Sequence, residues 1–388
     1  MVQLKGKTSV LDTSYTFFVV LSLVMYLFGH STEFGRLPFP DKLFYIPCGV
    51  CLVLAFMNRN YWSFTRSDWL FLTFYSIAFI YSSIFIGLEL EDTITCILAF
   101  LVFRYLSHIN LKKALVLLTY WAPIVIAIHY LFSSPLSLPP GYRYGGFQGD
   151  PNCFSFAMNL VIYACGVTLN YSKNTIARII ALVSIAGTIP LILAAASRGG
   201  VAIMLVLLFF MFRDTLRRHK VLSFLIAIVL LFSFGRIVSR FDSQLTTVSS
   251  RYNNTMEGED YRMAEFSIVP AVLSAHPEYT LLGIGYSQSI HAHEHFPEYY
   301  HEGRAHNTYM SVLLEEGVIG FILFISFLIS VGRTAFRNKG YADRNYRIIL
   351  YFSILFFIFT IYSLPFLPFW FAISIVSNKY DILNEDEL

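Results

Sequence analysis

Long apolar runs alternate with short polar segments along most of the chain. Several of these runs approach the roughly 20 residues that an α-helix needs to cross a bilayer. The pattern predicts about 12 membrane-spanning helices, near residues 15–30, 43–58, 69–87, 92–107, 113–133, 153–170, 178–196, 199–213, 221–236, 308–331, 347–363 and 365–377. The first run has no small-residue cleavage site, so we expect a retained helix and not a removable signal peptide.

Composition agrees with this pattern. Of the 388 residues, 56% are hydrophobic and only 14% are charged, whereas about a quarter of the residues in soluble domains carry a charge. We therefore predict an all-α, polytopic integral membrane protein. In this prediction residues 1–236 hold nine membrane helices, 237–306 form one larger loop with short helices, and 307–388 hold three helices and a polar tail.

The basic residues predict the orientation, because Lys and Arg beside membrane helices stay in the cytoplasm. With the N-terminus inside and twelve alternating helices, only nine of the 28 Lys and Arg residues fall outside: Arg36, Lys42, Arg143, Arg198, Arg236, Arg240, Arg251, Arg262 and Arg304. Both termini are then cytoplasmic, and the loop at 237–306 is outside. This asymmetry explains the net charge of +3, which therefore indicates no nucleic-acid partner.

The expected cytoplasmic loops are short and basic, and none contains a Gly-rich loop for nucleotide phosphates. We therefore expect any chemistry on the outer side, without ATP, a nucleotide sugar or another cofactor. The five cysteines lie in or beside the predicted helices, with none in the large loop, so no disulfide framework is predicted. Cys48 and Cys51 are interpreted as small packing residues.

Outer arginines are candidate anion-binding residues. Arg198 ends one predicted helix and is followed by two glycines. It either extends to lipid headgroups or, beside a helix N-terminus, binds phosphate oxygens. Arg143 lies in a loop rich in Pro and Gly, between Tyr142 and Tyr144, whose rings suit stacking on sugars.

Further polar residues stand where predicted helices begin. Asp150 and Asn152 precede one membrane helix, and we favour capping over catalysis for Asp150. Arg262 opens a segment, 259–279, whose apolar residues have helical spacing, which predicts a helix near the membrane surface. Arg304 follows at the end of the same loop.

His306 stands before Asn307, which is expected to cap a membrane helix. The positive end of the helix dipole disfavours imidazolium, so a neutral His306 would accept a proton near neutral pH. The alternative is an interfacial polar residue, but the outer arginines favour a site. Glu315 and Glu316 lie roughly 13–15 Å further along the helix, too far to share this proton directly. They are interpreted as polar lining of a lipid or acceptor channel, or as partners of other helices.

Some residues also suggest two other functions, metal binding and transport. His291, His293 and His295 would share a face in an extended segment and suit zinc, but no second ligand motif accompanies them, so no metal is predicted. His129 and the glutamate pair are polar groups of the kind that transporters bury. The two halves of the chain nevertheless show no matched broken helices. An enzyme is therefore favoured over a transporter or a structural membrane protein.

Four blocks of sequence resemble the O-antigen ligase and polymerase superfamily, in that family's order. They are YRYGGFQGDPN (142–152), AAASRGG (194–200), YRMAEFSIVPAVLSAHPEYTLLGIG (261–285) and RAHNTYMSVLLEEGVIGFILF (304–324). The last block contains the signature H-N-x9-G-x-x-G, from His306 and Asn307 to Gly317 and Gly320.

The resemblance implies a metal-independent glycosyltransferase in the bacterial inner membrane, with its active site facing the periplasm. The implied donor is a glycan on undecaprenyl pyrophosphate, and the implied acceptor is a second lipid-linked repeat unit (polymerase) or the lipid A core (ligase). It also implies that Arg198 and Arg262 handle the pyrophosphate and that His306 activates or orients the acceptor hydroxyl. We add seven candidate substrate contacts: Arg143, Tyr142, Tyr144, Asn152, Arg304, Asn307 and Glu316.

The GDPN block and the compact outer loops favour a polymerase over a ligase. A chain-length regulator and a flippase are further candidate partners, besides the lipid bilayer itself. A transporter of lipid-linked glycan remains the alternative from another class.

Overall fold

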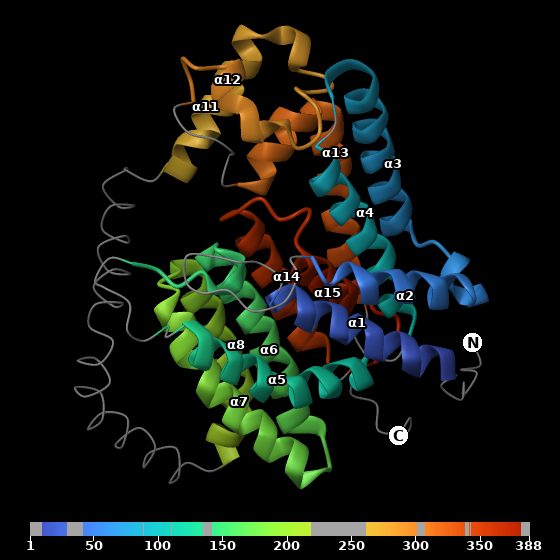
Figure 1. Ribbon diagram of the computed structural model, residues 1–388, viewed down its shortest axis with the longest axis vertical. Helices are drawn as coiled ribbons and strands as arrows, with labels where there is room; N and C mark the ends of the chain where they lie inside the picture. The colour runs from blue at the N-terminus through green and yellow to red at the C-terminus, as the bar shows by residue number, and fades with distance from the viewer. Residues whose placement is uncertain are drawn as a thin grey trace. The chain divides into compact units, whose positions relative to one another are not determined.

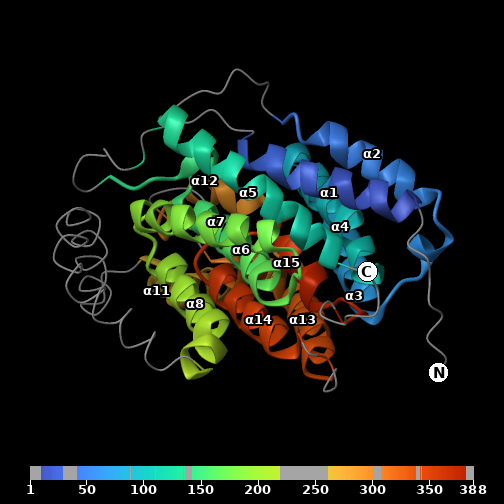
Figure 2. The same cartoon turned by 90° about the horizontal axis from the view of Figure 1, so that it is seen from below.

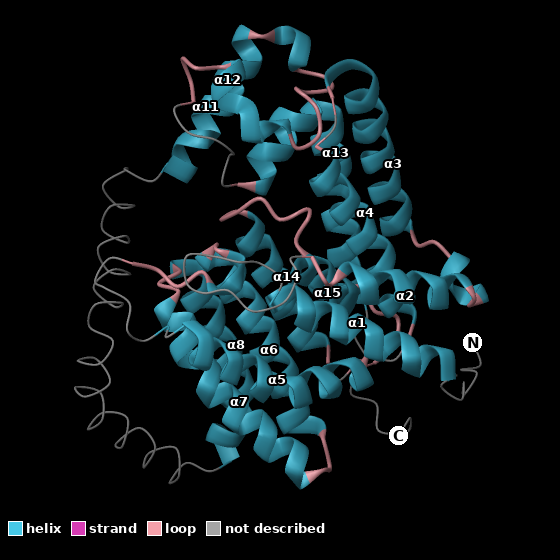
Figure 3. Ribbon diagram, in the orientation of Figure 1, coloured by secondary structure: helices cyan, strands magenta, loops and turns pink. Residues whose placement is uncertain are grey.

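The computed structural model describes residues 10–28, 42–87, 89–109, 111–133, 135, 142–218, 261–300, 307–337, 341 and 343–381. Within these ranges the chain consists of helices joined by turns and loops, without strands (Figure 3). The all-α prediction is confirmed for this part of the chain.

The helices are labelled in Figure 1. The longer ones are α1 (Val10–Phe28), α2 (Tyr45–Phe56), α3 (Arg66–Tyr81), α4 (Leu90–Arg104), α5 (Lys112–Ser133), α6 (Pro151–Tyr171), α7 (Thr175–Ala194), α8 (Arg198–Arg218), α11 (Tyr261–Ala275), α13 (Thr308–Arg337), α14 (Arg344–Ile358) and α15 (Leu367–Val376). The short ones are η1 (Arg59–Trp62), η2 (Ser82–Ile86), η3 (Tyr105–His108), η5 (Gly146–Gln148), η6 (Pro277–Tyr279), η7 (Gln288–His291) and α12 (Ala292–His295).

A helix lies at every predicted membrane range that falls within the described residues. The predicted range 221–236 lies outside them. Among the described residues, six segments are long and apolar enough to cross a membrane: α1, Arg66–Ile86, α5, α6, α7 and α13. Helices α2 and α15 are apolar but shorter, so the count of about 12 crossings stays a prediction.

Packing divides the chain into two compact units. The first comprises residues 1–19, 47–111 and 258–388, and the second comprises 20–46 and 112–257. This division differs from the predicted segments 1–236, 237–306 and 307–388, because those followed loop length and not packing.

In the second unit α6 packs against α5, α7 and α8 (Figures 1 and 2). Hydrogen bonds tie α6 to two of these helices: Thr168 Oγ1 lies 2.9 Å from Thr119 Oγ1 on α5. Asn159 Nδ2 donates to the carbonyl of Gly200 on α8, also over 2.9 Å. Buried polar groups need such partners, and α6 supplies them at the centre of the unit.

In the first unit α13 packs against α3, α11, α14 and α15. The buried ring of Trp370, on α15, has its centroid 4.5 Å from that of Phe71 and 5.6 Å from that of Phe100. Cys48 and Cys51 are both fully buried and neither forms a disulfide, in agreement with their interpretation as packing residues.

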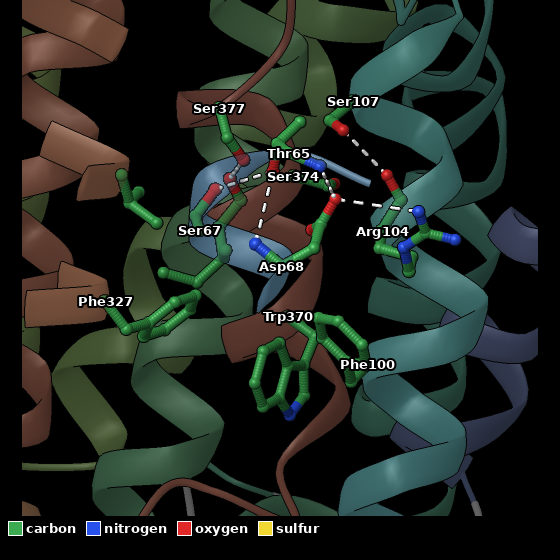
Figure 4. Close-up of a pocket in the computed structure, with 12 residues that line it drawn as sticks. Thr65, Ser67, Asp68, Phe100, Arg104, Ser107, Phe327, Trp370, Ser374 and Ser377 are labelled. Atoms are coloured by element: carbon green, nitrogen blue, oxygen red, sulfur yellow. Dashed lines mark hydrogen bonds and ion pairs between the residues drawn. The ribbon is translucent and has the colours of Figure 1, made fainter. Parts of the chain in front are cut away.

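A small cavity of about 20 Å³ lies between α3, α4, α13 and α15 of this unit (Figure 4). On its wall Arg104 lies 3.6 Å from Asp68, which forms a reciprocal capping box with Thr65. Arg104 also donates to the carbonyls of Tyr61 (2.7 Å) and Ser63 (3.1 Å). The charges of Arg104 and Asp68 are thus paired. The cavity has room for about one water, which indicates a packing contact between helix ends and not a substrate site.

Candidate active site

The start of α6 is fixed by a side-chain cap. Asp150 Oδ1 accepts hydrogen bonds from the backbone N–H groups of Asn152 (2.7 Å) and Cys153 (2.8 Å), and Pro151 is the first helical residue. The first N–H groups of a helix lack partners within the helix, and such a cap satisfies them. The capping interpretation of Asp150 is confirmed.

Tyr144 is a core residue of the second unit. Its ring is fully buried and meets Phe154 edge-on, while its hydroxyl lies 2.7 Å from His129 Nδ1. The following turn depends on Gly146, whose φ is +62° and where a Cβ would lie 2.4 Å from the Phe154 ring. The structure therefore does not support Tyr144 as a sugar-stacking residue, because its ring and hydroxyl are both engaged. Tyr142, by contrast, is exposed.

The N-termini of α6 and α8 are joined by one hydrogen bond. Ser197, which caps α8 by accepting from Gly200 N–H (3.2 Å), donates from Oγ to Asn152 Oδ1 (2.9 Å). Arg143 Nη2 donates to the same oxygen over 3.2 Å, and its Nε donates to the carbonyl of Ala195. Arg198 is the first residue of α8 and is partly exposed.

We call Arg143, Asn152, Ser197 and Arg198 the arginine corner. The sequence predicted three of these residues separately; the structure places Asn152 and Arg198 in the first turns of α6 and α8, and Arg143 in the loop before them, hydrogen-bonded to Asn152. Two helix N-termini bring partial positive charge, and two guanidinium groups add full charges. Such an arrangement suits a phosphate or pyrophosphate group.

In the first unit Asn307 caps α13, as predicted. Its Oδ1 accepts from the N–H groups of Tyr309 (3.0 Å) and Met310 (3.4 Å). Asn307 is fully buried, and its Nδ2 has no hydrogen-bond partner in the described part of the chain. The hydroxyl of Thr308 accepts from Ser363 N–H (3.1 Å), so the first turn of α13 is held on two sides while one amide donor is left over.

Three predicted site residues cannot be placed in this way. Arg304 and His306 lie outside the described residues, and Arg262 falls within α11 but its side chain lies outside the description. The helix predicted at 259–279 is confirmed as α11. Its buried face, Val269, Val272 and Leu273, belongs to one core cluster with Met310 and Leu314 of α13.

Helix α13 is interrupted at Gly317. There φ is +61° and ψ is −165°, a backbone conformation that is essentially restricted to glycine. The segment 280–285 packs into the interruption so closely that a Cβ on Gly317 would lie 2.4 Å from the carbonyl carbon of Leu281. A Cβ on Gly320, one turn later, would collide with the Glu316 side chain and lie 3.5 Å from the Phe74 ring.

Comparison with known proteins bears on these features. The sequence model of the O-antigen ligase family matches residues 179–325. This match supports the resemblance of the chain to the O-antigen ligase and polymerase superfamily. No curated protein compared with the chain matches it.

The O-antigen ligase match spans Arg198, Arg262 and His306 as well as the whole H-N-x9-G-x-x-G signature. The match to this family and the long apolar helices together indicate an integral membrane protein, and the family match supports a function of the O-antigen ligase and polymerase type in general. The structure gives the signature a physical meaning: Asn307 caps the helix, Gly317 interrupts it, and Gly320 makes room for Glu316.

Glu316 is buried between helices of the first unit, and its Oε1 has no hydrogen-bond partner among the described residues. Tyr75 and Tyr81, on α3, and Cys96, on α4, are close enough to interact electrostatically with it. Its role as a substrate contact stays a prediction. Glu315 instead accepts hydrogen bonds from Ser289, a partner that the sequence pattern did not predict.

The histidines of 291–295 lie in two short helical turns, η7 and α12, and not in the extended segment that would align them. His291 contacts Glu89 Oε1 (3.1 Å) and Glu294 Oε1 (3.3 Å). These carboxylates raise the pKa of His291 above its ordinary value, Glu89 having the larger effect. Among the described residues no group of His, Cys, Asp and Glu is arranged to hold a metal ion.

Proposed function

We propose that this protein is a periplasm-facing glycosyltransferase of the polymerase type, which extends an oligosaccharide carried on undecaprenyl pyrophosphate. The arginine corner is the observation that supports it most directly, because Arg198 begins a helix whose cap is bonded to the start of a second helix. We assign the donor pyrophosphate to Arg198 and Arg262 and the acceptor hydroxyl to His306. Arg143, Tyr142, Asn152 and Arg304 are proposed as further contacts to phosphate and sugar.

The proposed reaction needs no nucleotide. The acceptor hydroxyl attacks the anomeric carbon of the donor glycan, and the bond between this carbon and the pyrophosphate oxygen breaks. Undecaprenyl pyrophosphate leaves with the bonding electrons, while the hydroxyl proton passes to neutral His306. The arginines offset the charge that develops on the leaving group. We also assign a contact with a substrate oxygen to Asn307 Nδ2, which has no hydrogen-bond partner among the described residues.

The proposed function implies a cellular location and further protein partners. We propose that the protein lies in the bacterial inner membrane with both termini in the cytoplasm. A chain-length regulator and a flippase that delivers the lipid-linked glycan are proposed partners. Single cysteines introduced at Tyr142 and at Arg178 should react with a membrane-impermeant thiol reagent from the periplasmic and the cytoplasmic side, respectively.

The deciding experiment uses purified protein in lipid vesicles with an undecaprenyl-pyrophosphate-linked glycan, with and without lipid A core. Longer lipid-linked glycan together with released undecaprenyl pyrophosphate supports a polymerase. Transfer to the core would replace this assignment by a ligase. Movement of the glycan across the bilayer without bond exchange would replace it by a transporter.

Arg198 gives a sharper test within the same assay. Arg198→Ala should lower turnover by about 10²–10³-fold, the usual effect of removing one donor to a developing anion. Arg198→Lys should recover little, since lysine lacks the planar fork that binds two phosphate oxygens. Arg178→Ala is the matched control, because this arginine of α7 is exposed and its Nε donates to the Leu169 carbonyl. Equal turnover in both alanine variants would remove Arg198 from the site.

A further inference from the structure

The interruption of α13 leaves backbone groups that its own helix cannot satisfy. Residues 308–316 form a short half-helix before Gly317, and 318–337 form the longer half after it. At such a break the last carbonyls of the first half and the first N–H groups of the second half lose their helical partners. In a membrane protein these groups must be satisfied by other parts of the chain.

Residues 280–291, which we call the strap, supply those partners. The N–H groups of Ile284 and Gly285 donate to the carbonyls of residues 314 (2.9 Å) and 315 (2.8 Å). In return, the N–H groups of residues 318 and 319 donate to the carbonyls of Thr280 (2.9 Å) and Leu281 (3.3 Å). The strap thus replaces the missing helical hydrogen bonds on both sides of Gly317.

The side chain of Glu315 connects the short half-helix to the strap by hydrogen bonds. The Oε1 atom of Glu315 accepts from both the N–H (3.2 Å) and the Oγ–H (2.5 Å) of Ser289. Glu315 and Ser289 are both fully buried. Hydrogen bonds to a carboxylate in such surroundings are stronger than those between neutral groups.

The strap is also hydrogen-bonded to α3 and to the start of α4. Tyr81, at the end of α3, donates from its hydroxyl to the Gly283 carbonyl (3.2 Å). Ser287 Oγ donates to Asp92 on α4 (2.6 Å), and His291 contacts Glu89, the residue before α4. The strap is therefore a fixed surface, against which Glu315 orients the half-helix.

We propose that Glu315 is a positioning residue for glycosyl transfer, which acts through Ser289 to fix the half-helix that His306 and Asn307 precede. This inference rests on the proposed function. Asn307 caps the half-helix directly, so a rotation of the half-helix displaces the cap and the residue before it. The donor pyrophosphate is assigned to arginines on α8 and α11, outside the half-helix, so we expect loss of the Glu315–Ser289 contact to act mainly on kcat.

The test compares Ser289→Ala, Ser289→Thr, Glu315→Leu and the double variant Ser289→Ala/Glu315→Leu in the vesicle assay. Ser289→Ala should lower kcat about tenfold and change KM for the donor less than twofold. Ser289→Thr, which keeps the hydroxyl, should retain most activity. The double variant should be no slower than Glu315→Leu alone, because both changes break the same contact. Ser274→Ala is the matched control, since this serine is exposed and donates to the Pro270 carbonyl of its own helix.

Wild-type kcat in folded Ser289→Ala protein would overturn the inference, as would additive losses in the double variant. A rise in KM at unchanged kcat would also overturn it, because it would assign the pair to donor binding. Should Glu315→Leu not accumulate, amide hydrogen exchange in Ser289→Ala decides. Exchange at residues 309–316 must accelerate for the inference to stand. If the wild-type protein itself transfers no glycan, the proposed function fails instead.

Discussion

Replacing Gly317 by alanine tests whether the interruption of α13 is built into the fold. The conformation at Gly317 costs a residue with a side chain about 1–3 kcal/mol. A new Cβ would also lie 2.4 Å from the carbonyl carbon and 2.5 Å from the carbonyl oxygen of Leu281. Relieving an overpacked contact of this kind costs about 1–3 kcal/mol more. Together these effects amount to about 2–6 kcal/mol, a large share of the usual free energy of unfolding of about 5–15 kcal/mol.

The assay is thermal unfolding of the purified protein in detergent, combined with hydrogen exchange of the strap amides. Gly317→Ala should lower the midpoint by several degrees and speed exchange at Ile284 and Gly285. Gly49→Ala is the matched control, because a Cβ built there meets no atom of the described chain within 4 Å apart from its own chain neighbours and helix backbone, and a helix favours alanine over glycine. If Gly317→Ala unfolds at the same temperature as Gly49→Ala, the strap contact has been misjudged.

Three further changes probe the cap, the loop and the reaction. Asp150→Ala removes the cap of α6 and should lower the free energy of unfolding by about 1 kcal/mol, measured by denaturant unfolding; an unchanged midpoint would contradict the capping geometry. The carboxylate of Glu89 raises the pKa of His291, so this contact should stabilise the loop below the ordinary histidine pKa and weaken as pH rises through the folded-state pKa. The protection factors of the strap amides, which are corrected for the intrinsic pH dependence of exchange, should accordingly fall as pH rises through the raised pKa of His291, and His291→Gln should remove this fall. His306→Ala should lower turnover by roughly 10²-fold or more with donor binding retained, and a variant that instead loses donor binding would remove His306 from the acceptor role.

Local features of the site could be predicted from the sequence, and long-range ones could not. The helices were predictable because apolar length encodes a membrane helix, and the caps Asp150 and Asn307 act on backbone within three residues of themselves. Tyr144 was misjudged because its burial depends on a glycine turn that folds it onto another helix. Ser289 and Glu315 are 26 residues apart in the sequence. The hydrophobic pattern of their two segments does not show that they are in contact.

The spacing of the family signature follows from the same geometry. A half-helix of nine residues, 308–316, is too short to be stable in isolation, so it depends on contacts at its two ends. Asn307 and the Thr308 hydroxyl hold the first end, and the strap with Ser289 holds the second. Each residue of a helix adds a rotation of roughly 100° and a rise of about 1.5 Å. One residue more or less between Asn307 and Gly317 would therefore turn the capped end away from its partners while the strap stayed in register. The two glycines and their fixed distance from Asn307 thus belong to one structural arrangement, a short helix whose capped N-terminus is oriented by contacts at both of its ends.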